Sequence, residues 1–326
     1  MGAAGVAQAF LLAAGLGTRL RPLSRVVPKP VWPLFDVPLA ARVLDLLASA
    51  GVGRAVVNLH YLPEVLQGRL EPWVPQGLEL AWSREARILG TGGALVPWKD
   101  ALAGGPFFLA NADTYQEIDL RALARFHRQR GALATLSVAP VAPGRSAPLE
   151  LAPDGRIVRF LGARAPGARA GRPCEFTGLH LLEPEILAEV PDGPCCINAD
   201  VHQSLVGRGA PVYGFELEQG AFWSDLGTPG RYLAAHRRLL DLGRLSAAPG
   251  EVVDGPAGPW YRGRGAQIAE GVRIGPGTVV GAGARIEAGA RLRSCVVWPG
   301  ARCAGAEDAV VPDQGPVLAA GLETRN

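Results

Sequence analysis

A glycine-rich segment near the N-terminus carries the residues best suited to binding phosphate. Gly15 and Gly17 follow an apolar run, and Thr18 and Arg19 come next. At the carboxyl end of a first strand, such glycines leave backbone N–H groups bare, so a phosphate chain can approach them closely. Lys29 stands ten residues after Arg19, between two prolines, and it is one of two lysines among 33 basic residues. Lysine is a compact point charge on a flexible stem. Arg19, Lys29 and the row of backbone amides together suit the binding of a triphosphate.

The spacing of this segment differs from the two commonest phosphate-binding motifs. A dinucleotide fingerprint, GxGxxG, requires glycine at position 20, where the chain has Leu20. A P-loop requires GxxxxGK followed by Ser or Thr, and this pattern is absent from the sequence. If the segment binds phosphate, it does so as a phosphate loop of another class, and a plain turn between a strand and a helix is the alternative.

Strand and helix patterns alternate around this loop. Short apolar runs at 7–14, 54–60 and 106–113 alternate with amphipathic helical runs at 38–50 and 119–131. This alternation is typical of an α/β domain. We therefore expect a Rossmann-like, mixed but mostly parallel sheet, with the glycine-rich turn at the carboxyl end of its first strand.

Two further patterns complete this domain and mark its end. Residues 149–162 carry an Asp-Gly pair between alternating runs, which predicts a β-hairpin. Residues 228–245 have the pattern of a long helix, and a stretch rich in Ala, Pro and Gly follows them. We expect a first domain over 1–245 and a linker over 246–259.

The remaining residues, 260–326, follow a different period. Apolar residues recur every six positions, and glycine stands three positions after each of the first four. This spacing predicts a short left-handed parallel β-helix, in which one side chain per short strand points inward and small residues take the corners. The apolar positions are Ile268, Ile274, Val280, Ile286, Leu292, Trp298, Ala304 and Val310, and the glycines are Gly271, Gly277, Gly283 and Gly289. Only about two to three coils fit into this segment. The ends of so short a β-helix need to be covered by the first domain or by a second chain, and we expect a homo-oligomer.

Composition and charge exclude several classes of function. The net charge is +3, and no run of Lys and Arg interleaved with aromatic residues appears, so nucleic-acid binding is not expected. The apolar stretches fall short of the roughly 18 residues that cross a bilayer, and no secretory signal is recognised, so we expect a cytoplasmic protein without membrane contact. The five cysteines show no metal-binding spacing.

The phosphate loop resembles a known signature. The pattern GxGTRLxPL, followed by PKP, is similar to that of sugar-1-phosphate nucleotidyltransferases. The resemblance covers residues 7–245, and the hexapeptide repeat behind it matches two-domain members such as mannose-1-phosphate guanylyltransferases. It implies that the loop binds a nucleoside triphosphate, that Arg19 meets the departing phosphates, and that Lys29 neutralises the phosphate chain. It also implies that 1–245 is a nucleotidyltransferase domain.

Other landmarks of the family follow in order. The segment 85–95, EARILGTGGAL, resembles the nucleobase loop; 176–179, FTGL, resembles the sugar-facing strand; and 223–228, WSDLGT, resembles the stretch with the second metal ligand. The resemblance implies catalytic roles for Arg19 and Lys29; nucleotide binding by Ala13, Ala14, Gly15, Gly17, Thr18, Glu85, Gly90, Thr91 and Gly92; substrate binding by Asn111, Glu175, Thr177, Gly178 and Asn198; and Mg²⁺ binding by Asp113 and Asp225.

The implied chemistry asks for these residue types. An oxygen of a sugar 1-phosphate attacks the α-phosphorus of the nucleotide and pyrophosphate leaves, so the nucleophile is already ionised. The difficulty is repulsion between two polyanions. A hard cation held by Asp113 and Asp225, with Arg19 and Lys29 on the leaving side, offsets this repulsion and aligns the groups.

The sequence departs from the family pattern at two places. Ala112 precedes Asp113, where most members have glycine. Many members also have Glu-Lys-Pro after the hairpin to bind the sugar phosphate, and this chain lacks that lysine. Arg159 and Arg164 are the candidates to replace it.

Several functions remain open at this point. Nucleotidyl transfer with GTP and mannose 1-phosphate is favoured, while UTP or dTTP with another sugar 1-phosphate is an alternative. A non-catalytic regulatory subunit of the same fold is another, although the Arg, Lys and Asp set is intact. Acyl transfer by the β-helix is disfavoured because no histidine follows His236.

Overall fold

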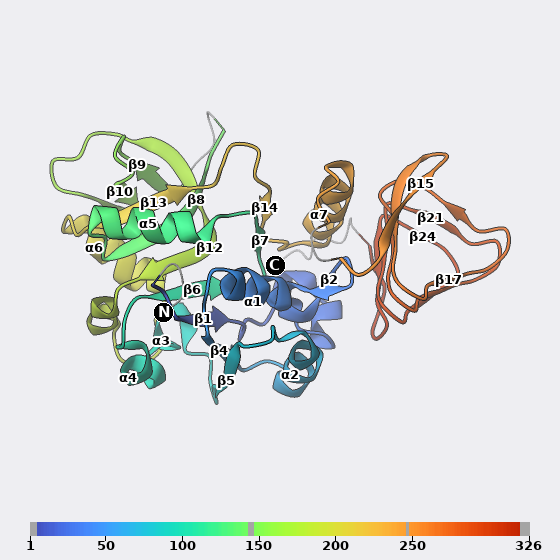
Figure 1. Cartoon of the computed structure of the whole chain (residues 1–326), viewed down its shortest axis with the longest axis horizontal. Coiled ribbons are helices and arrows are strands. Elements are labelled where there is room, and N and C mark those ends of the chain that lie inside the picture. The colour runs from blue at the N-terminus through green and yellow to red at the C-terminus, as the bar shows by residue number, and fades with distance from the viewer. Residues whose placement is uncertain (1–4, 143–146, 246–247, 320–326) are drawn as a thin grey trace. The chain divides into compact units, whose positions relative to one another are not determined.

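The computed structural model describes residues 5–142, 147–245 and 248–319, so the last residues of the predicted segment 260–326 lie outside the described residues. The chain forms two compact units, which we describe separately (Figure 1). The first unit comprises the residues up to Gly15, Val43–His60 and Val74–Trp223; the second comprises Leu16–Arg42, Tyr61–Trp73 and the residues from Ser224 onward. The domain limits expected from the sequence stay a prediction.

A mixed sheet of ten strands forms the centre of the first unit. Strand β1 (Gln8–Leu12) lies between β4 (Arg54–Leu59) and β6 (Phe107–Asn111), parallel to both, and β5 (Glu79–Arg84) lies parallel to β4. The middle residues of β1 are buried, as expected for a strand covered on both faces. The predicted α/β architecture with a mixed sheet is confirmed.

The other half of the sheet is mostly antiparallel. Strand β12 (Arg172–Leu182) is antiparallel to β6, to β8 (Ala134–Pro140) and to β9 (Leu149–Leu151). The predicted hairpin is confirmed, because β9 is antiparallel to β10 (Ile157–Phe160) and Asp154 Oδ1 accepts a hydrogen bond from the Arg156 amide in its turn. The sheet also includes β11 (Ala163–Arg164) and β13 (Val212–Glu216).

The predicted helices are present with recognisable ends. Helix α5 (Leu120–Arg130) begins after Asp119, whose side chain accepts hydrogen bonds from two backbone amides, and ends at Gly131 in the left-handed conformation. It packs against β8, β12 and β13 (Figure 1). The other helices are α1 (Leu39–Ser49), α2 (Pro63–Leu70), α3 (Gly90–Gly93), α4 (Lys99–Leu102), α6 (Gln203–Gly207) and α7 (Pro229–Asp241). No helix among the described residues is long and apolar enough to cross a membrane.

Short 3₁₀ segments and strand pairs complete the two units. The 3₁₀ helices are Thr18–Leu20, Leu23–Arg25, Lys29–Val31, Glu71–Trp73, Val96–Trp98 and Pro184–Glu189, and one π-helix spans Ile197–His202. The short strands are β2 (Pro33–Leu34), β3 (Val37–Pro38), β7 (Tyr115–Gln116) and β14 (Trp223–Ser224). Strands β2 and β3 form a small hairpin directly after Lys29.

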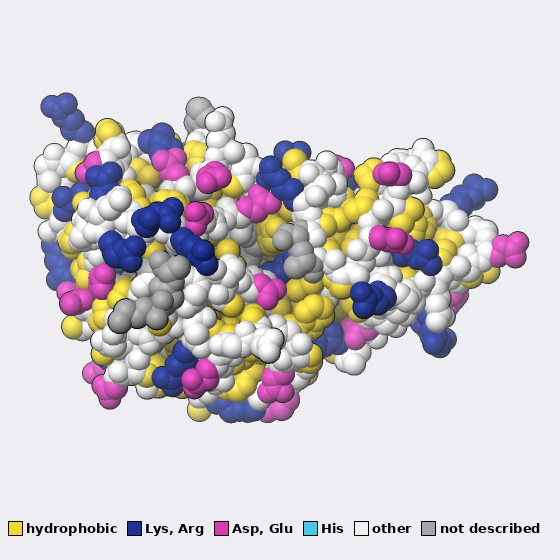
Figure 2. Space-filling model, in the orientation of Figure 1, with side chains coloured by type: hydrophobic (Ala, Val, Ile, Leu, Met, Phe, Trp, Pro, Cys, Tyr) yellow, Lys and Arg dark blue, Asp and Glu magenta, His cyan; other side chains and the backbone are white. Residues whose placement is uncertain are grey.

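The second unit contains the predicted β-helix. Its strands stack into three sheets, one for each side of the coil, and the pairs between successive coils are parallel. The strands are β15 (Glu251–Gly255), β16 (Gly258–Arg262), β17 (Gln267–Ile268), β18 (Arg273–Ile274), β19 (Val279–Val280), β20 (Arg285–Ile286), β21 (Arg291–Arg293), β22 (Val296–Val297), β23 (Arg302–Cys303), β24 (Ala306–Glu307), β25 (Ala309–Val311) and β26 (Leu318–Ala319). The outermost strands of the largest sheet, β15 and β26, pair antiparallel with their neighbours. The four predicted corner glycines all have positive φ, between 63° and 73°. Charged side chains project from this part of the chain in Figure 2.

The six-residue frame changes after Leu292. Val297, and not Trp298, aligns with Val280, because the chain turns one residue earlier at Ser294, where φ is 48°. Cys303 likewise aligns with Ile286. The last three predicted inward positions are therefore wrong in frame: Trp298, Ala304 and Val310. Ala304 is exposed, whereas Trp298 is fully buried in a contact outside the coil.

Candidate active site

The turn after β1 is fixed by a buried asparagine. The backbone N–H groups of Ala13 and Ala14 both donate to Asn58 Oδ1, at 2.6 and 3.2 Å. Asn58 lies near the end of β4 and is 3% exposed. A side chain built on Gly15, in contrast, would meet no atom within 4 Å. The bare backbone predicted for this loop therefore begins at Gly15, since the two amides before it already have a partner.

The same asparagine holds the segment predicted to contact the nucleobase. Asn58 Nδ2 donates to Glu85 Oε1 at 2.7 Å, and Glu85 Oε2 accepts from the Leu89 amide at 3.0 Å. Glu85 is buried, and both of its carboxylate oxygens are used within the protein. Asn58 was not among the predicted site residues, although an amide within the apolar run of β4 was a usable signal.

The glycines of the segment GTGG make close backbone contacts. The Gly92 amide donates to the Cys195 carbonyl at 3.0 Å, and the Thr91 hydroxyl accepts from the Ile197 amide at 2.9 Å. A Cβ atom on Gly90 would lie 2.3 Å from the Cys195 carbonyl oxygen, so any side chain there would force the two segments apart. The glycines are thus required for packing, whatever the segment binds.

The candidate residues for substrate binding lie on β6, β12 and the π-helix. A Cβ atom on Gly178 would lie 3.3 Å from Asn111 Nδ2, so these two predicted residues are neighbours. The Thr177 hydroxyl is buried and donates to Gln116 Oε1 at 2.8 Å. Within the part of the chain that the structure describes, Asn198 Oδ1 is buried and has no hydrogen-bond partner. A buried acceptor without a donor is costly, and a ligand hydroxyl would satisfy it.

Arg19, Lys29 and Asp225 come together in the second unit. Lys29 is 6% exposed, and its Nζ donates to the main-chain oxygen of Asp225. A Cβ atom on Gly227 would lie 2.9 Å from Arg19 Nη2 and 3.0 Å from Asp225 Oδ2, which places the Arg19 guanidinium beside this segment. The structure therefore gathers the two predicted cations and one predicted metal ligand.

Arg231 joins this group and was not predicted. Its Nη1 lies 2.7 Å from both carboxylate oxygens of Asp225. Burial alone would raise the pKa of Asp225, but the Arg231 hydrogen bonds and charge outweigh it, with help from the Gly227 amide and Lys29, so that the pKa lies below its ordinary value. An arginine in the first turn of α7 opposes the helix dipole. An arginine at this unfavourable position of the helix was the signal in the sequence that could have identified Arg231 as a functional residue.

Asp225 has the properties of a magnesium ligand. It offers hard carboxylate oxygens, and its lowered pKa keeps them ionised at neutral pH. Among the described residues, no group of three or more His, Cys, Asp or Glu side chains is placed to hold a metal. Arg231 occupies both oxygens of Asp225, so a bound cation would have to share them or displace the guanidinium. Asp113 follows β6, as its predicted role requires.

The two arginines proposed to replace the missing lysine have another partner. Arg159 Nε donates to Glu150 Oε1 at 2.6 Å, and Arg164 Nη2 donates to Glu150 Oε2 at 3.0 Å. The Gly171 amide also donates to this carboxylate. That amide, together with the two guanidinium groups, lowers the pKa of Glu150 to about 2 against the opposing effect of burial. Both guanidinium groups share this one carboxylate, which neutralises only one of their two charges, so a role for Arg159 or Arg164 in binding the sugar phosphate stays a prediction.

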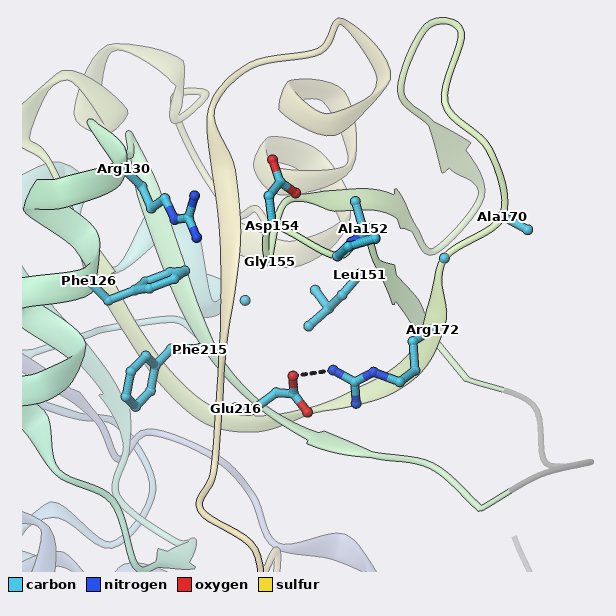
Figure 3. A pocket seen from close by; sticks show the side chains of 13 residues that line it. Phe126, Arg130, Leu151, Ala152, Asp154, Gly155, Ala170, Arg172, Phe215 and Glu216 are labelled. Atoms are coloured by element: carbon cyan, nitrogen blue, oxygen red, sulfur yellow. Dashed lines mark hydrogen bonds and ion pairs between the residues drawn. The ribbon is translucent and has the colours of Figure 1, made fainter.

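A separate pocket lies in the first unit between α5, the β9–β10 turn and the end of β13 (Figure 3). Its volume is about 690 Å³. Arg130 and Arg172 face it together with Asp154 and Glu216, so its charges balance. None of the predicted site residues lines it, and it is a feature apart from the candidate active site.

Replacing Glu150 by glutamine is expected to lower stability in a pH-dependent way. The folded-state pKa of about 2 lies below the ordinary 4.5, so the carboxylate stabilises the folded state above pH 4.5 and loses this effect as the pH falls toward 2. Urea unfolding of wild type and Glu150→Gln should differ at pH 7 and converge in acid. The exposed Glu218→Gln is the control, and a constant difference across this range would contradict the assignment.

Asn58→Ala is expected to destabilise the first unit. It leaves two backbone N–H groups and one buried carboxylate oxygen without their partner, at a cost of about 2–4 kcal/mol in the free energy of unfolding. Urea denaturation measures this change, with Gln67→Ala on the surface of α2 as the control, for which we expect less than about 0.5 kcal/mol. Equal stabilities for the two variants would show that Asn58 does not hold the turn.

The sequence matches a known family and relatives within it. A family model described as "Nucleotidyl transferase" matches residues 8–160. "Probable mannose-1-phosphate guanylyltransferase 1" of Oryza sativa subsp. japonica is 32% identical over 254 residues, which are 76% of this chain and 68% of the relative. "Mannose-1-phosphate guanylyltransferase 1" of Arabidopsis thaliana is 30% identical over 255 residues, with 76% and 69% covered.

A solved structure shows the same fold. HddC from Yersinia pseudotuberculosis is similar with a TM-score of 0.58 at 24% identity, over 71% of this chain and 98% of that one. It has also been solved in complex with GMP-PN. The fold, the order of the landmarks and the level of identity to the plant relatives lead to one conclusion: the chain belongs to the nucleotidyl transferase family, among the sugar-1-phosphate nucleotidyltransferases.

Proposed function

We propose that the protein transfers GMP from GTP to mannose 1-phosphate, giving GDP-mannose and pyrophosphate. The proposed transfer reaction is supported by the grouping of Arg19, Lys29 and Asp225 in the second unit. The two cations can offset the charge of a triphosphate, and the carboxylate of Asp225 could hold Mg²⁺. The choice of substrates is supported by the plant relatives, which are named as mannose-1-phosphate guanylyltransferases. A solved neighbour in complex with GMP-PN also favours a guanine nucleotide.

Each residue of the candidate site has a role in this proposal. The backbone from Gly15 to Thr18 binds the triphosphate, with the turn before it held at Ala13 and Ala14, and the segment of Glu85, Gly90, Thr91 and Gly92 binds the base. Arg19 and Lys29 stabilise charge on the departing pyrophosphate. Asp113 and Asp225 are the carboxylates that would hold Mg²⁺, which when bound supplies a hard positive charge to the phosphate oxygens.

The sugar phosphate is assigned to Asn111, Glu175, Thr177, Gly178 and Asn198. Asn198 has the strongest support, because its buried Oδ1 is an acceptor without a partner among the described residues. Thr177 has the weakest, because its hydroxyl already donates to Gln116. UTP or dTTP with another sugar 1-phosphate is the alternative for this site, and the substrate matrix described below distinguishes the pairs.

We also propose that the protein is a homo-oligomer, with the end of the β-helix as the surface involved. Ile268 and Ile274 in the first coil are only half-buried, whereas Ile286 and Leu292 in the next coil are buried. Covering these two side chains would stabilise an assembly. Analytical ultracentrifugation at micromolar concentration should show a species larger than the monomer, and a monomer alone would refute the proposal.

Pyrophosphate release is expected only when both proposed substrates are present. Each nucleoside triphosphate is crossed with a panel of sugar 1-phosphates in the presence of Mg²⁺, and GTP with mannose 1-phosphate should give the fastest release. EDTA should abolish it. Release with a different pair would correct the substrates, and no release from any pair, with nucleotide still bound, would favour a regulatory subunit.

Lys29→Ala and Asp113→Ala are each expected to lower turnover by on the order of 10² or more, the scale for losing one electrostatic group. Lys99→Ala is the matched control, since Lys99 is the other lysine and its Nζ donates to the Val190 carbonyl at 3.3 Å. Steady-state kinetics of the three variants measure the effect. A variant at Lys29 or Asp113 with full activity would remove that residue from the mechanism.

A further inference from the structure

The hairpin that follows Lys29 has an unusual tip. Its strands are β2 and β3, and Phe35 and Asp36 between them have positive φ angles of 51° and 69°. A turn of this kind favours glycine, asparagine or aspartate, and phenylalanine is strained there. Strain of about 1–3 kcal/mol persists only where the surroundings hold the residue in place. The contacts of Phe35 and Asp36 therefore identify the part of the protein that holds this hairpin in place.

The tip is inserted into the β-helix. Asp36 is 6% exposed; its Oδ2 accepts from the Tyr261 hydroxyl at 2.8 Å, and its Oδ1 accepts from the Ala282 amide at 2.9 Å. A Cβ atom on Gly263 would lie 2.5 Å from Asp36 Oδ2, so the coil is open at this point for the carboxylate. The Phe35 ring packs edge-on against Tyr261, with 5.2 Å between centroids. Burial raises the pKa of Asp36, and the hydrogen bonds oppose this effect.

The base of the hairpin is held by aromatic residues. The Tyr232 hydroxyl donates to the Pro33 carbonyl, and Trp298 Nε1 donates to the Tyr232 oxygen at 3.1 Å. The Trp32 ring packs against both other rings with centroids 5.3 Å away, and its Nε1 donates to the Val27 carbonyl at 3.0 Å. Lys29 lies between Val27 and Trp32, so the chain is fixed on both sides of it.

The segment of Asp225 rests on the same support. Helix α7 begins four residues after Asp225 and contributes Tyr232 and His236 to the aromatic contacts. It also lies against β16 and β25 of the β-helix. Lys29 donates a hydrogen bond to the main chain of Asp225. This bond joins the segment before the hairpin to the segment before α7, and both segments pack against the same aromatic residues and the β-helix.

We propose that the β-helix positions Lys29 and Asp225 for the reaction, and that Asp36 is the positioning residue that couples the β-helix to them. The coupling itself rests on the contacts above, and its effect on turnover rests on the proposed function. A shift of the hairpin would move Lys29 relative to the phosphates, and misplacement by about 1 Å can cost about 10²-fold in rate.

Asp36→Ala tests this coupling by removing both hydrogen bonds to the coil. We expect the kcat of the folded enzyme to fall by about 10- to 100-fold, with little change in the KM of the sugar phosphate. Asp36→Asn keeps the acceptor for the Ala282 amide, and its kcat should stay closer to wild type. The folded fraction of each variant, measured by circular dichroism, corrects the rates.

Leu292→Ala is the matched control for a purely structural effect. Leu292 is 2% exposed inside the coil and makes none of the described contacts with the hairpin. It should lower stability while leaving kcat per folded molecule unchanged. Should Asp36→Ala be poorly folded, Tyr261→Phe removes only one of the two hydrogen bonds and is expected to lower kcat in the same direction by a smaller factor.

Hydrogen exchange provides a readout independent of activity. In the full-length protein, Asp36→Ala should increase deuterium uptake in peptides covering 27–38 and 229–236, and Leu292→Ala should not. Equal uptake in these peptides for both variants, or an unchanged kcat for Asp36→Ala, would overturn the proposal. If the wild type releases no pyrophosphate with any substrate pair, the proposed function fails, while the exchange result still decides whether the coupling exists.

Discussion

A buried ammonium group needs counter-charges and acceptors close by, and Lys29 obtains them from the segment of Asp225. The carboxylate of that residue in turn has Arg231 as its partner and the Arg19 guanidinium beside it. Such a group of like charges around one acid is stable only if the backbone holds each member in place. The hairpin after Lys29, helix α7 and the β-helix all contribute to that through the contacts of Asp36, Tyr232 and Trp298.

The first unit solves a similar problem with a neutral side chain. Asn58 donates to Glu85 and accepts from the turn after β1, so one buried amide fixes both the loop predicted to bind phosphate and the segment predicted to bind the base. A charged residue at this position would need its own partner in the core. The amide, with both donor and acceptor, satisfies three groups at once, and the next residue, Gly15, has open space beside it.

Local patterns made most of the fold predictable from the sequence, and long-range contacts explain what was missed. The helical run over 119–131, which became α5, and the corner glycines of the coil are local signals, and both predictions are confirmed. The change of frame at Ser294 was missed because one non-glycine residue takes a positive φ there, which no composition rule announces. The contact between Arg159 and Glu150 was also missed, because the pairing of β9 with β10 brings these two residues together and no local pattern indicates it.

The β-helix itself carries a sequence signal for its role. Two of its sides present an exposed arginine next to a buried residue, as in Arg285–Ile286 on one side and Arg291–Leu292 on the other. The third side has adjacent valines in Val279–Val280 and Val296–Val297, all of them buried. Only one residue of each pair can point into the coil, so the other faces outward and is covered by the rest of the unit, where α7 lies against β16 and β25. A repeat that served only as a spacer would have no need for a second apolar face, whereas a repeat that supports Lys29 and Asp225 requires one.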